Sequence, residues 1–287
     1  AATEILVCNF FANTVTRHNA TSGELIAPLD PAGDIRGPLC VRLGPDGLLY
    51  VASEGNNSVK RFNATTGAFV DNFISGGPLT QPTGLAWDGA GNLFVGSFDQ
   101  SAVLKYNATS GAFIATFVAP GQGTLSGADN GMTFGPDGNL YVPSYNNNRV
   151  VRYNGSTGAT IGTFLGSVNR PRILEFRPEA LYVTSETVAS VRRYNPSTGA
   201  TLSSFFTAGS GGLGTPVGMA FTNDNRLLVG STTNNRIIAY NATTGALIGT
   251  FADASRGING PTFITVIPGP APATLFSLIA LTFSRGR

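Results

Sequence analysis

The sequence predicts an all-β fold: a six-bladed β-propeller whose last blade is closed by strands from both ends of the chain, followed by an apolar C-terminal tail. Three observations predict it. The chain repeats with a period of about 45 residues, each repeat contains four short strand-like segments, and two incomplete repeats at the ends complement each other. A single four-stranded sheet cannot bury both faces until neighbouring sheets pack against it, so such repeats are typical of propeller blades.

Five full repeats open with similar sequences: PLCVRLGPDGLLYVAS, PTGLAWDGAGNLFVGS, NGMTFGPDGNLYVPS, PRILEFRPEALYVTS and PVGMAFTNDNRLLVGS. Each continues into a second hairpin, for example NSVKRFNATTGAFVDNF. The GPDG and NATTG segments are tight turns, because Pro presets φ and Gly accepts a positive φ. We expect these turns on one face, here named the lower face. The longer, variable loops then lie on the opposite, upper face, which is the expected recognition surface.

The two ends of the repeat array predict how the ring closes. Residues 5–29 match only the last three strands of a repeat, and residues 261–268 match only the first. Together they form a sixth blade whose innermost strand comes from the C-terminal side, which leaves no large open edge. We therefore assign residues 1–268 to the propeller and residues 269–287 to a Pro-rich linker and apolar tail.

The segments GPDGNLYV and NNRVVRYN, with NNRIIAYN and NNSVKRFN as further copies, resemble those of NHL-type six-bladed β-propellers and their gluconolactonase-like relatives. The resemblance covers residues 5–268 and is more specific for the fold than for the function. Those relatives that are lactonases or metal-dependent hydrolases hold a divalent ion at the channel mouth. This resemblance implies weak candidate metal ligands, namely Glu54, Asp99, Asp129 and Glu186.

Composition excludes a nucleic-acid-binding protein. Only 12% of the residues are charged, the net charge is +2, and the 18 Lys and Arg residues form no cluster longer than a pair. A phosphate-tracking surface needs a concentrated basic patch. The first residues, Ala1-Ala2-Thr3, are what a signal peptidase leaves after a small-residue site, so we expect a secreted protein.

No catalytic constellation is evident. The single histidine, His18, aligns with Phe62, Tyr106 and their equivalents at the end of the third strand, which is a packing position. The sequence therefore offers no His general base and no Ser-His-Asp triad. Serines at the ends of the second strands form a ring that we expect to bind backbone groups, and Asn9 takes the same place in the closing blade. These serines are Ser53, Ser97, Ser144, Ser185 and Ser231.

Two pairs of residues are brought near the axis by the predicted topology. Arg42 and Glu175 occupy the same first-strand position in blades three apart, so they form either a channel-lining pair or two independent, solvated charges. Cys8 and Cys40 end and begin strands of adjacent blades at the same face. In a secreted chain this placement predicts either a disulfide that reinforces ring closure or two free thiols.

N-glycosylation sequons recur in the turn between the third and fourth strands. They occur at Asn19, Asn63, Asn107, Asn154 and Asn241, with one more at Asn56 in an upper loop, whereas Pro196 blocks Asn195. The same Asn-x-Thr-x-Gly pattern is also a good tight turn, and we weight this interpretation above glycosylation.

The tail, IPGPAPATLFSLIALTFSRGR, resembles the PEP-CTERM sorting tail of bacterial surface proteins, with Ala271 in place of the motif's glutamate. Residues 273–284 would span only about 18 Å as a helix, against a hydrocarbon core of about 30 Å, so the membrane is at most a transient partner. The segment could instead serve as an added strand. The residues that would carry this assembly role are Leu275, Phe276, Leu278, Ile279, Leu281 and Phe283.

Three functions remain open at this point. The leading hypothesis is a non-enzymatic, extracellular, cell-surface protein of a bacterium that assembles head to tail into filaments through its tail and needs no cofactor. The alternatives are a metal-dependent lactonase or lyase, and a surface-anchored binding module.

Overall fold

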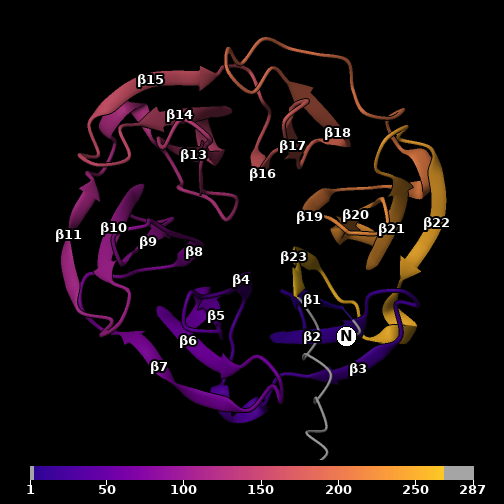
Figure 1. Cartoon of the computed structure of the whole chain (residues 1–287), viewed down its shortest axis with the longest axis horizontal. Coiled ribbons are helices and arrows are strands. Elements are labelled where there is room, and N and C mark those ends of the chain that lie inside the picture. The colour runs from indigo at the N-terminus through magenta and orange to yellow at the C-terminus, as the bar shows by residue number, and fades with distance from the viewer. Residues whose placement is uncertain (1–2, 268–287) are drawn as a thin grey trace, which may run out of the picture.

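The structure, a computed structural model that describes residues 3–267, is a six-bladed β-propeller (Figure 1). The closing blade consists, from the axis outward, of β23 (Pro261–Ile267), β1 (Glu4–Asn9), β2 (Thr14–Asn19) and β3 (Leu25–Pro28). β1 pairs antiparallel with β23 from Glu4 opposite Ile267 to Cys8 opposite Phe263. The predicted closure of the ring by strands from both ends of the chain is therefore confirmed.

The other five blades follow in chain order. The second blade has β4 (Pro38–Leu43), β5 (Leu48–Ser53), β6 (Ser58–Asn63) and β7 (Phe69–Ser75); the third has β8 (Pro82–Trp87), β9 (Asn92–Ser97), β10 (Ala102–Asn107) and β11 (Phe113–Val118). The fourth has β12 (Thr133–Phe134), β13 (Leu140–Ser144), β14 (Arg149–Tyr153) and β15 (Thr160–Leu165). The fifth has β16 (Pro171–Phe176), β17 (Leu181–Ser185) and β18 (Val188–Tyr194), and the sixth has β19 (Pro216–Phe221), β20 (Arg226–Ser231), β21 (Arg236–Asn241) and β22 (Leu247–Ala252).

Short 3₁₀ turns complete the described part of the chain. They are η1 (Pro31–Gly33), η2 (Glu54–Asn56), η3 (Gln122–Thr124), η4 (Tyr145–Asn147), η5 (Ser210–Gly212), η6 (Thr232–Asn234) and η7 (Ala254–Arg256). Within residues 3–267, no helix is long and apolar enough to cross a membrane. The six tail residues to which we assigned an assembly role lie outside the described residues.

One blade differs from the predicted four strands. The segment after β18 follows the outer edge of its blade only through isolated contacts, such as the hydrogen bond from the Phe205 amide to the Val191 carbonyl. The Arg193 guanidinium donates to the carbonyl and hydroxyl oxygens of Ser203, and the Phe206 ring stacks on Tyr240 of the next blade at 4.0 Å. These side-chain contacts replace part of the regular ladder, so the segment keeps its place at the edge of the blade without forming a fourth strand.

Aromatic side chains join each blade to the next. Tyr50 on β5 makes edge-to-face contacts with Phe73 of its own outer strand and with Trp87 of the next blade, both at 5.2 Å between ring centroids. Three further blades repeat this arrangement around Phe94, Tyr141 and Tyr182. Such pairs add about 0.5–1.5 kcal/mol each beyond the area that they bury. The core of the ring is therefore a series of repeated aromatic contacts between blades.

Basic side chains of the third strands cover these aromatic groups. Arg61 lies directly opposite Tyr50 in the ladder, with its guanidinium 4.4 Å from the centre of the Phe73 ring. The Tyr50 hydroxyl donates a hydrogen bond to Asp46 of the GPDG turn. Arg152, Arg193 and Lys105 take the same place in other blades. Many of the scattered Arg and Lys side chains thus pack on aromatic rings within the blades.

The segment before β12 crosses the axis. Figure 1 shows the loop between β11 and β13 reaching toward the centre of the ring. The fully buried Asn130 amide nitrogen donates to the carbonyls of Leu39 and Thr262, which belong to two other blades. Gly131 forms a parallel bridge with Ile173, and a Cβ at this glycine would lie 2.0 Å from the Arg172 carbonyl oxygen. Only glycine permits so close an approach of the two inner strands.

We predict that Gly131→Ala destabilises the fold by more than about 2 kcal/mol, because its methyl group would overlap backbone that cannot rotate away. Gly89→Ala is the matched control, since a Cβ there meets nothing within 4 Å. Urea unfolding followed by fluorescence measures both. Equal midpoints for the two variants would show that the inner strands are not held this closely.

Candidate binding site at the upper axial mouth

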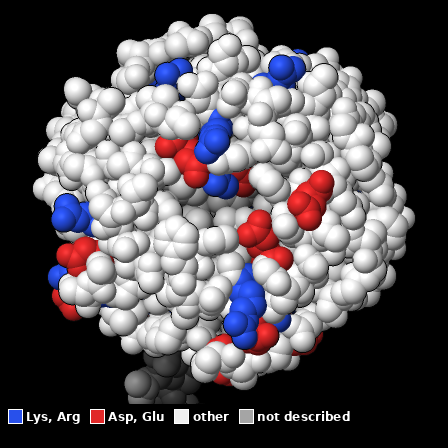
Figure 2. All heavy atoms as spheres, turned by 180° about the vertical axis from the view of Figure 1, so that it is seen from behind, with Lys and Arg blue, Asp and Glu red and all other residues white. Residues whose placement is uncertain are grey.

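Four charged or polar side chains meet where the inner strands of two neighbouring blades begin. Asp129 precedes β12, Arg172 lies at the start of β16, Glu186 directly follows β17, and Tyr145 lies in η4 after β13. Inner strands start and second strands end on the upper face, so all four lie there near the axis. Figure 2 shows acidic and basic side chains gathered around the central hollow of one face, in an otherwise largely uncharged surface.

Arg172 holds this cluster together. One terminal nitrogen of its guanidinium donates to both Asp129 carboxylate oxygens, at 2.9 and 3.1 Å, and the other donates to Glu186 Oε1 at 3.1 Å. The guanidinium lies 4.4 Å from the centre of the Tyr145 ring. The Tyr145 hydroxyl donates to the second carboxylate oxygen of Glu186. Both carboxylates are thus oriented by one cation.

Burial and charge act differently on three of the four acids at this mouth. Burial raises the pKa of the fully buried Asp129, and Arg172 offsets only part of this effect. Burial alone would also raise the pKa of Glu186. The charge of Arg172 and the hydrogen bond from the Tyr145 hydroxyl outweigh burial and hold this pKa below its usual value. The pKa of Glu54 is raised, first by burial and then by the charge of Asp129, and no ion pair involves its carboxylate within residues 3–267.

The four acids named from the sequence are therefore brought to one mouth, but not into a coordination sphere. Within residues 3–267, no group of three or more His, Cys, Asp or Glu side chains is placed to hold a metal ion. The Arg172 guanidinium lies between Asp129 and Glu186 instead. The mouth contains four carboxylates and two cations, Arg170 and Arg172, so its formal net charge is −2. A site with this charge is suited to a cationic group.

Sequence reasoning missed Arg172 and Tyr145. The signal for Arg172 is its place in the repeat, because the corresponding inner-strand positions carry uncharged residues, namely Leu39, Thr83, Asn130, Val217 and Thr262. A lone charge at an otherwise uncharged repeat position needs partners, and the acids at neighbouring strand ends supply them.

The serine ring has the structural role that the repeat suggested. Ser53 accepts a hydrogen bond from the Arg36 amide and donates one to the Arg36 carbonyl. Ser144 and Ser231 bind the loop before their own blade in the same way, and Asn9 accepts from the Asn259 amide. His18 is fully buried between Thr16 and the Gly23 carbonyl, and burial lowers its pKa. These groups organise loops and strand ends.

The two cysteines are buried as free thiols on adjacent blades, so of the two alternatives, a disulfide or two free thiols, the structure has the second. Burial raises the pKa of both thiols, and the charge of Cys40 adds to the rise at Cys8. The thiols therefore share one apolar environment without a bond between them.

The sequon asparagines form the expected turns. Asn19 Oδ1, for example, accepts from the amides of Thr21 and Ser22, and Asn195, which has no sequon, forms the same turn. The turn therefore needs Asn for its oxygen, whereas glycosylation would use the nitrogen. Asn56 differs, because its amide nitrogen donates to the Asp34 carbonyl at 2.7 Å. Glycosylation stays a prediction and is disfavoured at Asn56.

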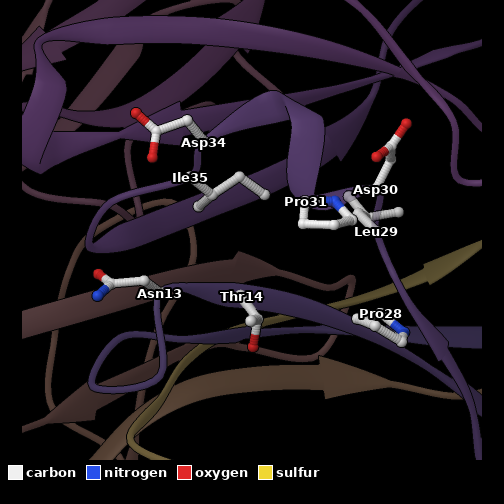
Figure 3. A pocket seen from close by; sticks show the side chains of 8 residues that line it. All are labelled: Asn13, Thr14, Pro28, Leu29, Asp30, Pro31, Asp34 and Ile35. Carbon is white, nitrogen blue, oxygen red and sulfur yellow. The ribbon is translucent and has the colours of Figure 1, made fainter.

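A further pocket of about 240 Å³ lies between the closing blade and the second blade. Figure 3 shows Asp30 and Asp34 at opposite ends of it, above Asn13 and Thr14. The Asp30 carboxylate accepts from the Ala32 amide, and Asp34 pairs with Arg36. Both acids thus stabilise the connection between the two blades.

We predict that Arg172→Met costs about 3–5 kcal/mol of unfolding free energy at pH 7, because it leaves the buried Asp129 carboxylate without its cation. Arg170→Met is the control. Its side chain is 54% exposed and its ion pair with Glu186 is long, 3.7 Å, so the expected cost is below about 1 kcal/mol. Adding Asp129→Asn to Arg172→Met should recover part of the loss. Urea unfolding of the wild type and these three variants measures the free energies of unfolding. A loss below about 1 kcal/mol for Arg172→Met would contradict the role assigned to Arg172.

We also predict that Glu54→Gln raises the melting temperature at pH 7. The folded pKa of Glu54 lies above its unfolded value of about 4.3, so the native state loses stability as the pH rises through the folded pKa. The glutamine variant avoids this loss, and its advantage should vanish below about pH 4. Asp99→Asn, at an exposed acid of the same mouth, should change little. Melting curves from pH 3 to 8 test the prediction, and an equal melting temperature of wild type and Glu54→Gln at pH 7 would contradict it.

Comparison with known proteins agrees with the fold. Residues 188–263 match a family model described as outer membrane protein assembly factor BamB. A chain in the crystal structure of a nidogen/laminin complex is 16% identical, with a TM-score of 0.74 over 94% of this chain and 100% of that chain. A protein of unknown function from Bacteroides caccae is 12% identical, with a TM-score of 0.70 over 93% and 99% of the two chains. No curated protein sequence matches. At these identities the likeness shows the six-bladed propeller fold alone.

Proposed function

We propose that the protein is a non-enzymatic, extracellular propeller of the NHL type that assembles head to tail, with the tail of one copy bound at the upper mouth of the next. The observation that carries this proposal is charge complementarity. Within residues 3–267, two carboxylates of the mouth, Glu54 and Asp99, form no ion pair, and burial disfavours the charged form of Glu54. The linker and tail, residues 269–287, contain no Asp or Glu and contain Arg285 and Arg287.

The direction of the chain fits this arrangement. β23 runs from the upper to the lower face and ends at Ile267 opposite Glu4, so the tail begins on the face opposite to the mouth. Twenty residues follow Ile267, and a fully extended chain of this length spans up to about 66 Å. A six-residue strand, which sets the thickness of the ring, is only about 20 Å long. A contact from one face to the opposite face of the next copy is heterologous and repeats into an open filament.

The outer strands supply a second support for a subunit of an assembly. Each blade exposes one aliphatic side chain three residues after its turn glycine, and these side chains are between 40% and 56% exposed. We name this set the apolar rim: Ile26, Val70, Ile114, Ile161, Leu202 and Ile248. Register shifts beside the outer strands bend their edges and oppose uncontrolled strand pairing. The rim thus favours side-chain packing between neighbouring copies over addition of strands.

The alternative functions use the same mouth. A metal-dependent lactonase or lyase would employ Glu54 as a ligand or base, because Glu54 is half-buried at this mouth and forms no ion pair within the described residues. Metal analysis of the wild type, Glu54→Ala and Glu186→Ala tests that function. A binding module would hold a protein at the upper face, and one protein of the same fold was solved in a nidogen/laminin complex. A PEP-CTERM-like sorting tail would add a bacterial surface location to either function.

We predict that the full chain forms filaments visible by electron microscopy, and that Glu54→Gln/Asp99→Asn raises the concentration needed for assembly about tenfold, equivalent to about 1.4 kcal/mol. Arg285→Gln/Arg287→Gln should have the same effect, and added salt should weaken wild-type assembly. Glu24→Gln/Glu179→Gln, at two exposed acids near the lower face, is the control and should assemble normally.

Since Glu54→Gln should also stabilise the fold, a loss of assembly together with a higher melting temperature separates a lost contact from unfolding. Single rings of the wild type at high concentration would overturn the proposal and return the tail to a sorting role. Assembly that is indifferent to both pairs of charge changes would overturn the assigned contact.

A further inference from the structure

A second set of charges lies on the axis, toward the lower face. Six residues occupy the same level of the six inner strands, each opposite the corresponding residue of the second strand. In order around the ring they are Arg42, Ala86, Thr133, Glu175, Ala220 and Thr265. Blades that face each other across the axis therefore carry Ala with Ala, Thr with Thr, and Arg with Glu.

Arg42 and Glu175 line one cavity of about 220 Å³, together with Met219, Ala220, Phe263 and Thr265. The cavity lies below the level at which the Asn130 side chain crosses the axis, so it is separated from the upper mouth. β19 and β23 lie between the two charged residues, and the small Ala220 side chain leaves the space open. The volume is that of about seven water molecules, enough for a small organic molecule.

The two charges are not neutralised by the protein. No ion pair within residues 3–267 includes either Arg42 or Glu175, although the two face the same cavity. In the part of the chain that the structure describes, the buried Arg42 Nε has no hydrogen-bond partner, and the guanidinium lies 5.4 Å from the centre of the Phe263 ring. Burial raises the pKa of Glu175, with the charges of Arg42 and Arg177 opposing the rise. Leaving opposite charges apart in a half-buried cavity costs free energy that a bridging ligand would recover.

We propose that this cavity binds a small zwitterion of the amino-acid class, with its carboxylate on Arg42 and its ammonium group on Glu175. A guanidinium binds a carboxylate through two parallel hydrogen bonds, and a carboxylate pairs with an ammonium group as a point charge. A simple anion would be repelled by the negative charge of Glu175, and a simple cation would be repelled by the positive charge of Arg42. The cavity therefore selects molecules that carry both charges. This proposal does not depend on the assembly contact, because the acids of that contact lie at the upper mouth, whereas Arg42 and Glu175 lie toward the lower face.

The test is isothermal titration of the full-length protein with glycine, β-alanine and γ-aminobutyrate, and with acetate and methylamine at matched ionic strength. We expect saturable binding of at least one zwitterion, with a Kd of about 1 mM or tighter, and none of acetate or methylamine. Arg42→Met and Glu175→Gln should each weaken binding at least about tenfold, the loss of one charged contact.

Two matched alanine variants separate binding from folding. Ala220→Val fills the cavity and should abolish binding, whereas Ala86→Val, the same change across the axis at a residue that does not line the cavity, should leave binding intact. Melting curves confirm that each variant is folded. No saturable binding of any zwitterion, equal binding of acetate, or equal effects of the two valine variants would each overturn the proposal. Filament formation is measured separately, so either proposal can fail alone.

Discussion

The wedge of an aromatic side chain between neighbouring blades is the constraint on which the rest of this structure depends. Tyr50, Phe94, Tyr141 and Tyr182 each contact a ring at the outer edge of their own blade and an inner-strand ring of the next blade. Leu228 and Leu6 occupy this position in the last full blade and the closing blade. The interfaces beside the closing blade therefore lack this aromatic contact. The ladder between β1 and β23 joins the two ends of the described chain within the closing blade.

Fixing the blades in this way brings six inner strands close to one axis, where space and charge become limiting. Gly131 is required because β12 and β16 approach each other at backbone distance, and Asn130 fills the centre by bonding to two other blades. Arg172 begins the same neighbouring strand and neutralises the carboxylate that precedes Asn130. The pairing of Asp129 with Arg172 thus stabilises the plug itself as well as one rim of the mouth.

The repeat made the blade count, the closure and the turns predictable, because each depends on local sequence that recurs. The inner strand predicted at residues 261–268 is observed at Pro261–Ile267, and the serines bind backbone as expected. What the repeat could not show lies where blades differ from one another. Arg172 was not recognised because its partners come from two other segments, and the outer strand after β18 was mispredicted because Arg193 and Phe206 redirect it.

The residues that depart from the repeat also make the two ends of the axis chemically different. Six equal blades would make an axis that differs between faces only in its turns. Instead, the upper end carries excess negative charge, and the lower end carries Arg42 and Glu175, which form no ion pair within residues 3–267. The Asn130 side chain lies between the two ends, because it donates to the Leu39 and Thr262 carbonyls of two other blades. A ring with two unlike ends and an apolar rim presents different chemistry along its axis and at its perimeter. The repeated residues form the scaffold, and a few inner-strand residues that depart from the repeat, Arg42, Arg172 and Glu175, give the two ends of the axis their charges.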